Sequence, residues 1–269
     1  MMDEKKEQKI IVFTTLTAAD RNLILAGTRL AIIFKKELCL VYRLHKKENK
    51  VAVKEKLTEY TLTLKNELPE IKASIMLTAH KLRYLPEILA DDHEAIMLVA
   101  NSLLFKKYAM AVTESPVPFL FINPDMPLTG FKKIVVPIDI RKETSDTLLW
   151  CSWFGRFNHS EVIALAAGDK GKDSKQEVNH NIVLAKKLFQ KTGVSHQILR
   201  GRKSSLQNSF EAAEFAKSAE SEMLILLGSS VVTLLDLLIG LPERKIISGA
   251  GNLAILLVNP RRDNYILCD

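Results

Sequence analysis

Two stretches, "KIIVFTT" at residues 9–15 and "KIVVPID" at residues 133–139, decide the fold because they open two copies of one pattern. Each is a short apolar run without alternation, which is typical of a strand buried on both faces of a parallel sheet. Three further pairs follow in the same order: 36–42 with 160–166, 94–102 with 222–230, and 115–124 with 251–260. Four matches in one order predict two homologous halves.

Stretches with helical periodicity separate the expected strands. Helices are predicted near residues 19–35, 51–68, 144–157, 175–192 and 211–219. Strands that alternate with helices of this length form right-handed βαβ units. Each half is therefore predicted to be an open parallel α/β sheet of the adenine-nucleotide, Rossmann-like type.

The halves join at "NPDMPLTGF", residues 123–131, where two internal prolines and a glycine interrupt regular structure. We expect one domain over residues 1–126, a second over 130–262, and a short polar tail at 263–269.

The last strand of each half is expected at residues 117–122 and 253–258. A terminal strand lies at a sheet edge, and an exposed edge has to be covered. In a tandem chain the two edges can pair with each other. We therefore predict an internal pseudo-dimer.

Charge and composition favour an ordinary globular protein. The formal net charge is +7, with 47% hydrophobic and 26% charged residues. Lysine pairs are scattered over different expected elements, so we interpret them as a solvated surface and do not expect nucleic-acid binding. No apolar run reaches the ~18 residues that cross a membrane, and the charged start does not resemble a signal peptide. We expect a cytoplasmic protein without membrane contact.

Catalytic and metal-binding patterns are missing from the sequence. The six histidines and three cysteines stand apart from one another, without the spacing of a zinc site or a disulfide framework. "DDHE" at residues 91–94 comes just before an apolar run, so we interpret it as a helix-to-strand turn. We expect no metal site and no catalytic residues. Ser205, which follows Gly201, is predicted to cap a helix.

A family resemblance rests on three stretches of the second half: "KKIVVPIDIRKETSDTLLW" from residue 132, "SEVIALAAG" from residue 160, and the run from residue 221 to "LLVNP" at 256–260. Together they resemble the universal stress protein domain, and the two halves resemble tandem copies of it. The resemblance implies a domain that usually dimerises through its last strand. One branch of that family binds ATP and another does not.

In the ATP-binding branch, an aspartate after the first strand contacts adenine and a G-x2-G-x9-G-[ST] loop holds the phosphates. Backbone amides can wrap a phosphate only where side chains are absent. By this resemblance, Asp139 matches the aspartate, Ala167 falls near the pocket-lining position after the second strand, and Gly228 matches the first loop glycine. Ser229 and Ser230 can still donate hydrogen bonds to an anion.

The loop also departs from the family pattern. Val231 occupies the second glycine position, and Gly240 lies one residue before the third, where Leu241 replaces the expected hydroxyl residue. In the first half Thr15 stands where Asp139 does, and the corresponding loop has no glycine. A phosphate cradle is therefore not expected in the first half.

These observations leave two main functions, while a third, nucleic-acid binding, rests only on the net charge. The first is a non-enzymatic, stress-associated binding or scaffold protein that acts through protein partners or self-association as a dimer, with a degenerate nucleotide pocket and no cofactor. The alternative is an ATP- or AMP-binding stress sensor that uses Asp139 and the loop from Gly228 to Gly240, with at most weak ATP hydrolysis. Asp139 also has a local interpretation, as part of the turn and cap that start the following helix.

Overall fold

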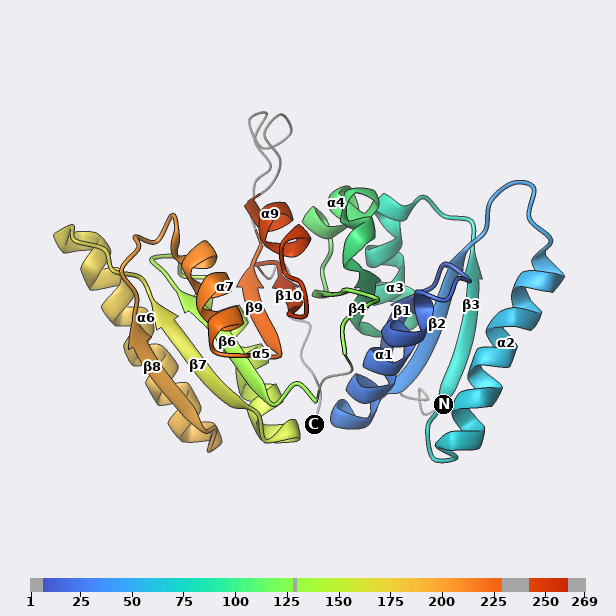
Figure 1. The fold of residues 1–269 in the computed structure, drawn as a ribbon, viewed down its shortest axis with the longest axis horizontal. Coiled ribbons are helices and arrows are strands. Elements are labelled where there is room, and N and C mark those ends of the chain that lie inside the picture. Colours follow the sequence, from blue (N-terminus) through green and yellow to red (C-terminus); the bar gives the residue numbers. More distant parts are fainter. Residues whose placement is uncertain (1–6, 128–129, 229–241, 261–269) are drawn as a thin grey trace, which may run out of the picture. The chain divides into compact units, whose positions relative to one another are not determined.

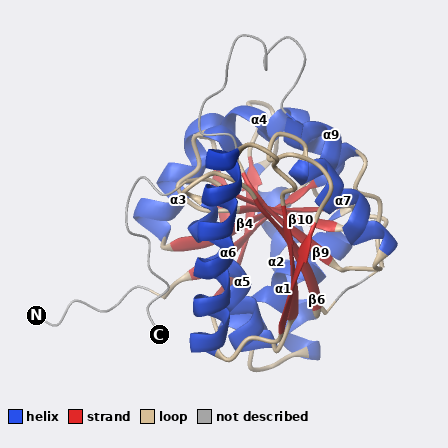
Figure 2. Ribbon diagram, turned by 90° about the vertical axis from the view of Figure 1, so that its left-hand side faces the viewer, coloured by secondary structure: helices blue, strands red, loops and turns tan. Residues whose placement is uncertain are grey.

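The computed structural model describes residues 7–127, 130–228 and 242–260. These residues form two compact units, the first within 7–127 and the second comprising the remainder. Each unit contains a parallel five-stranded sheet with helices packed on it (Figures 1 and 2). The open parallel α/β fold predicted from the sequence is confirmed.

The first unit has the strand order β3-β2-β1-β4-β5. Its elements are β1 (Lys9–Phe13), α1 (Asp20–Phe34), β2 (Glu37–Arg43), α2 (Lys50–Glu67), β3 (Ala73–Thr78), η1 (Leu82–Tyr84), α3 (Leu85–His93), β4 (Ala95–Asn101), η2 (Ser102–Leu104), α4 (Phe105–Thr113) and β5 (Phe119–Ile122). All seven residues of β4 are buried, as the apolar run predicted for a strand covered on both faces.

The second unit repeats this arrangement as β8-β7-β6-β9-β10. Its elements are β6 (Lys133–Ile138), α5 (Thr144–Asn158), β7 (Glu161–Ala166), α6 (Lys172–Thr192), β8 (His196–Arg200), α7 (Asn208–Ser218), β9 (Met223–Leu227), α9 (Pro242–Ser248) and β10 (Ala254–Val258). The pairing of the two last strands, β5 and β10, remains a prediction.

The ends of corresponding helices repeat in backbone detail. The C-cap residue after α1 is Lys35, with φ 53°, and the C-cap residue after α5 is His159, with the same φ. Both residues are in the left-handed region, which is uncommon outside glycine and ends a helix sharply. The two halves therefore share local geometry where their sequences differ.

One sequence-based helix start is wrong. Helix α7 begins at Asn208, and its N-cap position is Gln207, without a side-chain capping bond. Ser205 instead donates its hydroxyl to Asp169 Oδ2 at 2.5 Å. The aspartate on a neighbouring loop competes for this serine, which local sequence cannot reveal.

Gly155 in α5 allows the segment after α6 to pack closely. A Cβ at this position would lie 2.5 Å from Cγ1 and 2.6 Å from Cγ2 of Val194. Val194 is buried, so its methyl groups have little room to move. The glycine thus sets the distance between α5 and the residues that lead into β8.

We predict that Gly155→Ala lowers the free energy of unfolding by about 1–3 kcal/mol, the usual cost of overpacking a core. The gain in helix propensity, about 1 kcal/mol, opposes this loss and places the net effect at the lower end. Urea denaturation measures it. In the double variant with Val194→Ala, the loss should be smaller than the sum of the two single losses; strict additivity would contradict the contact.

Candidate functional site

The candidate site of the second unit lies at the carboxyl ends of its central strands. Asp139 follows β6, Ala167 follows β7 and Gly228 follows β9. Between β6 and β9 the order of connections reverses, and in open α/β sheets ligands bind at such a switch point. The structure thus brings these three predicted residues to one edge of the sheet. Ser229, Ser230 and Gly240 lie outside the described residues.

The carboxylate of Asp139 is buried and occupied. Its residue is 3% exposed. Oδ2 accepts hydrogen bonds from Nε and Nη2 of Arg141 at 2.9 and 2.6 Å, and Oδ1 accepts the Arg141 backbone N–H at 2.8 Å. The Thr144 hydroxyl lies 3.4 Å from Oδ1. Both oxygens therefore have protein donors, and a ligand would have to displace Arg141 to reach them.

The turn that contains Asp139 is held from two sides. Asn181 of α6 donates Nδ2 to the carbonyl oxygens of Asp139 and Arg141 at 2.8 and 3.0 Å. Arg141 Nη1 lies 3.5 Å from the carbonyl oxygen of Leu227, at the end of β9. The guanidinium therefore spans the switch point between β6 and β9. The bond from the Arg141 amide to Asp139 is an Asx turn, whereas Glu143 occupies the N-cap position of α5.

The other two predicted residues also have their backbone groups in use. The Ala167 N–H donates to Ile138 at 2.8 Å, and its carbonyl accepts from Arg200 Nη1 at 3.2 Å. The Gly228 N–H donates to the Val258 carbonyl at 2.7 Å. Neither amide is available to a ligand in this arrangement.

A side chain approaches Gly228 closely. A Cβ at this position would lie 2.4 Å from Asn259 Oδ1. That distance is far below van der Waals contact, so a larger residue would displace the end of the Asn259 side chain. The space beside Gly228 is therefore filled by a protein side chain in this arrangement.

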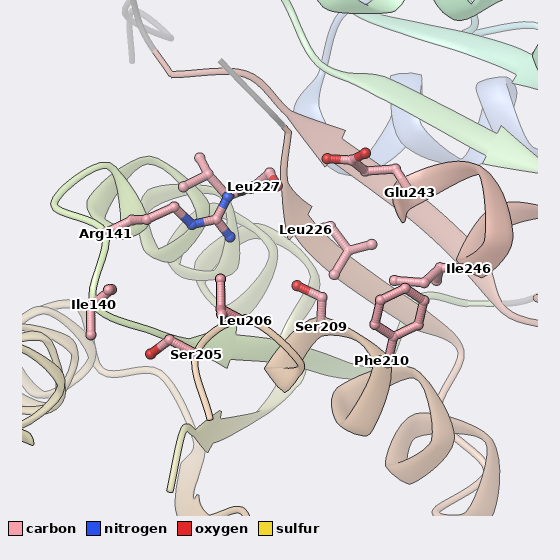
Figure 3. Close-up of a pocket in the computed structure, with 10 residues that line it drawn as sticks. All are labelled: Ile140, Arg141, Ser205, Leu206, Ser209, Phe210, Leu226, Leu227, Glu243 and Ile246. Atoms are coloured by element: carbon pink, nitrogen blue, oxygen red, sulfur yellow. Dashed lines mark hydrogen bonds between the residues drawn. The ribbon is translucent and has the colours of Figure 1, made fainter. Parts of the chain in front are cut away.

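A pocket of about 260 Å³ is lined in part by Arg141 (Figure 3). Leu226, Phe210 and Ile246 supply much of its apolar wall, with Arg141 at one end and Glu243 at the other. Among the described residues, the wall of this space is therefore mainly apolar, and Asp139, Ala167 and Gly228 do not contribute to it.

Other site chemistries find no support in the described part of the chain. No three His, Cys, Asp or Glu side chains there gather as a metal site. Burial raises the pKa of the Cys39 and Cys151 thiols, so neither is an activated nucleophile at neutral pH. Among the described helices, none combines the length and apolarity required to cross a bilayer.

The first unit contains the same pair of residues in exchanged positions. Thr15 and Asp20 correspond by the repeat to Asp139 and Thr144. The Thr15 hydroxyl donates to Asp20 at 2.8 Å, so the threonine–aspartate bond persists with the roles reversed. Asp20 is buried, and its carboxylate accepts the backbone amides of residues 15–17. Among the described residues, no arginine is bonded to it.

A second cavity, of about 480 Å³, lies at this edge of the first unit. Arg43, His45 and Lys107 are among its lining residues. The sequence analysis did not predict this cavity, because it considered only a glycine loop as a binding motif. The sequence signals for the cavity are basic residues at the end of β2 and in α4, which are far apart in the chain.

Comparison with solved structures identifies the fold. A universal stress protein from Archaeoglobus fulgidus DSM 4304 matches 96% of this chain and 98% of its own chain, with a TM-score of 0.66 and 11% identity. The chain has the universal stress protein fold. A functionally unknown protein from Pseudomonas aeruginosa PAO1 shares this fold over 94% of this chain and 93% of its own, with a TM-score of 0.66 and 12% identity. At these identities the likeness concerns the fold.

Sequence-level comparisons give no match. No protein-family model matches the chain, and no curated protein matches it. The tandem universal stress protein resemblance drawn from the sequence is therefore confirmed through the structure, over nearly the whole length of the chain.

We predict that Asp139→Ala lowers the free energy of unfolding by about 2–3 kcal/mol, because it removes hydrogen bonds to a buried charge. Glu143→Ala is the matched control: this neighbouring acidic residue is exposed, and its loss should cost less than about 0.5 kcal/mol. Chemical denaturation of both variants measures the difference. Equal effects would contradict a structural role for the Asp139 carboxylate.

Proposed function

We propose that this chain is a non-enzymatic, stress-associated binding or scaffold protein of the universal stress protein type, with a degenerate nucleotide pocket in its second unit. The observation that carries the proposal is the occupied carboxylate of Asp139. Two guanidinium N–H groups of Arg141 donate to Oδ2, and such charge-assisted hydrogen bonds are among the stronger ones in proteins. A nucleotide base would have to replace that partner with weaker, uncharged donors.

The backbone around the pair supports the same function. A phosphate cradle needs free amides, and the Gly228 amide is bonded to β10. The space beside Gly228 holds the Asn259 side chain. Phosphate binding at this position would require both bonds and packing to rearrange.

If the second-unit site is closed to small molecules, the protein has to act through other binding partners. In this proposal the protein is cytoplasmic, binds protein partners or a second copy of itself, and uses no cofactor. An ATP- or AMP-binding sensor remains the competing function, and one experiment separates the two.

Calorimetric titration of the full chain with ATP, with and without Mg²⁺, should show no binding tighter than about 1 mM. Protein freshly purified under native conditions should release no adenine nucleotide in mass analysis, and ATP hydrolysis should stay at the background rate. Micromolar binding that disappears in Asp139→Ala would contradict the proposal and favour the sensor.

A further inference from the structure

The larger cavity belongs to the first unit, at the carboxyl ends of β1 and β2. Its apolar wall includes Phe13 and Val41 from these strands, Leu82 from η1 and Leu104 from η2. At about 480 Å³ it falls within the usual range of small-molecule sites. The wall can take an apolar body, and its charged groups decide which ligand fits.

The ionisable side chains that line this cavity are basic or phenolic. Arg43, His45 and Lys107 line it, and no aspartate or glutamate is among the described lining residues. Arg43 Nε donates to the His80 carbonyl at 2.9 Å, which leaves its two terminal nitrogens without a partner within the described ranges. The Lys107 ammonium likewise has no hydrogen-bond or ion-pair partner among those residues. The cavity therefore presents uncompensated positive charge.

Tyr108 adds a hydroxyl donor to the same cavity. The residue as a whole is 6% exposed, and its hydroxyl has no hydrogen-bond partner in the part of the chain that the structure describes. Because this oxygen is not among the fully buried polar atoms that lack a partner there, it reaches the open space of the cavity. The centroid of its ring lies 5.4 Å from that of Phe13 and 6.1 Å from that of Phe119. These ring contacts hold the Tyr108 side chain in place. Burial, with a smaller contribution from the Asp20 charge, raises the pKa of Tyr108, so the hydroxyl remains a proton donor.

Two carboxylates near the cavity are held by other groups. Asp20 accepts the amides of residues 15–17, whose dipoles offset its charge. Glu48 accepts the Tyr42 hydroxyl and the His45 amide, each at 2.8 Å. Neither lines the cavity. The Arg43 and Lys107 side chains thus remain available to an anion from outside.

We propose that this cavity binds a small organic anion, an aromatic carboxylate or a phosphate monoester. The charged group of the ligand would lie between Arg43 and Lys107 and accept a hydrogen bond from the hydroxyl of Tyr108. Guanidinium and ammonium groups bind both kinds of oxyanion, the guanidinium through its fork. The apolar body of the ligand would pack against Leu82 and Leu104.

This recognition uses side chains instead of a backbone cradle. The amides of residues 15–17 are bonded to Asp20, and the Leu103 amide at the start of η2 is bonded to Asn101 Oδ1 at 2.9 Å. The site does not depend on the function proposed above, which concerns the second unit. Failure of one leaves the other standing.

Titration of the full chain with phenyl phosphate, benzoate and neutral phenol, followed by calorimetry, tests the site. We expect at least one anion to bind and phenol to bind at least about tenfold more weakly, because phenol lacks the charge. The anion that binds more tightly identifies the charged group of the ligand class.

The variants Lys107→Gln and Tyr108→Phe should each weaken binding about tenfold. Lys106→Gln is the matched control, because Lys106 is the adjacent exposed lysine of α4 and does not line the cavity. It should leave affinity unchanged, and thermal melting verifies that all variants fold. The proposal is overturned if neither anion binds at about 10 mM, if phenol binds equally well, or if Lys106→Gln weakens binding as much as Lys107→Gln.

Discussion

A carboxylate buried beside the end of a strand must be paired, and this constraint shapes both units of the protein. In the second unit Asp139 is paired with the guanidinium of Arg141. In the first unit Asp20, whose repeat position corresponds to Thr144, is paired with backbone amides. The same problem is therefore solved once with a cation and once with the main chain.

The choice of partner decides what remains for a ligand. Where Arg141 neutralises the carboxylate, it also spans the space between β6 and β9 and leaves a small apolar pocket. In the first unit the amides of residues 15–17 bind Asp20, so they are not available to bind a phosphate. The neighbouring basic side chains of Arg43 and Lys107 form no ion pair with this carboxylate. Only the aspartate of the Asp139–Arg141 ion pair is fully buried, because the Arg141 side chain is 36% exposed. An ion pair of this kind is weak evidence for stability in itself. In the function that we propose, its main consequence is the closure of a site.

Much of the fold could be predicted from the sequence, because its signal is repeated. The apolar runs that became β1 and β6, and β4 and β9, match in composition and order. The placement of Asp139, Ala167 and Gly228 after three strands also follows from the pattern. The bounds of helices α3 and α4 of the first unit were not predicted, because each helix has only nine residues and its periodicity is short.

The chemistry of the sites could not be predicted in the same way. Nothing in the sequence indicates that the Arg141 side chain folds back onto a residue two positions earlier, or that Asn259 approaches Gly228. The first-unit cavity joins Arg43 of β2 with Tyr108 of α4, and only the packing of η1 and α4 around the sheet brings them together. Sequence motifs report local backbone needs, whereas these contacts depend on tertiary packing.

The most direct test of the central claim is the side-chain Nε–H of Arg141, observed by NMR in ¹⁵N-arginine-labelled protein. If the site is closed, this N–H is protected from hydrogen exchange, and its resonance does not shift when ATP is added. In Asp139→Asn the protection should be lost. Exchange as fast as that of a solvent-exposed arginine, or a shift of this resonance on addition of ATP, would contradict the closure of the second-unit site by the Asp139–Arg141 pair.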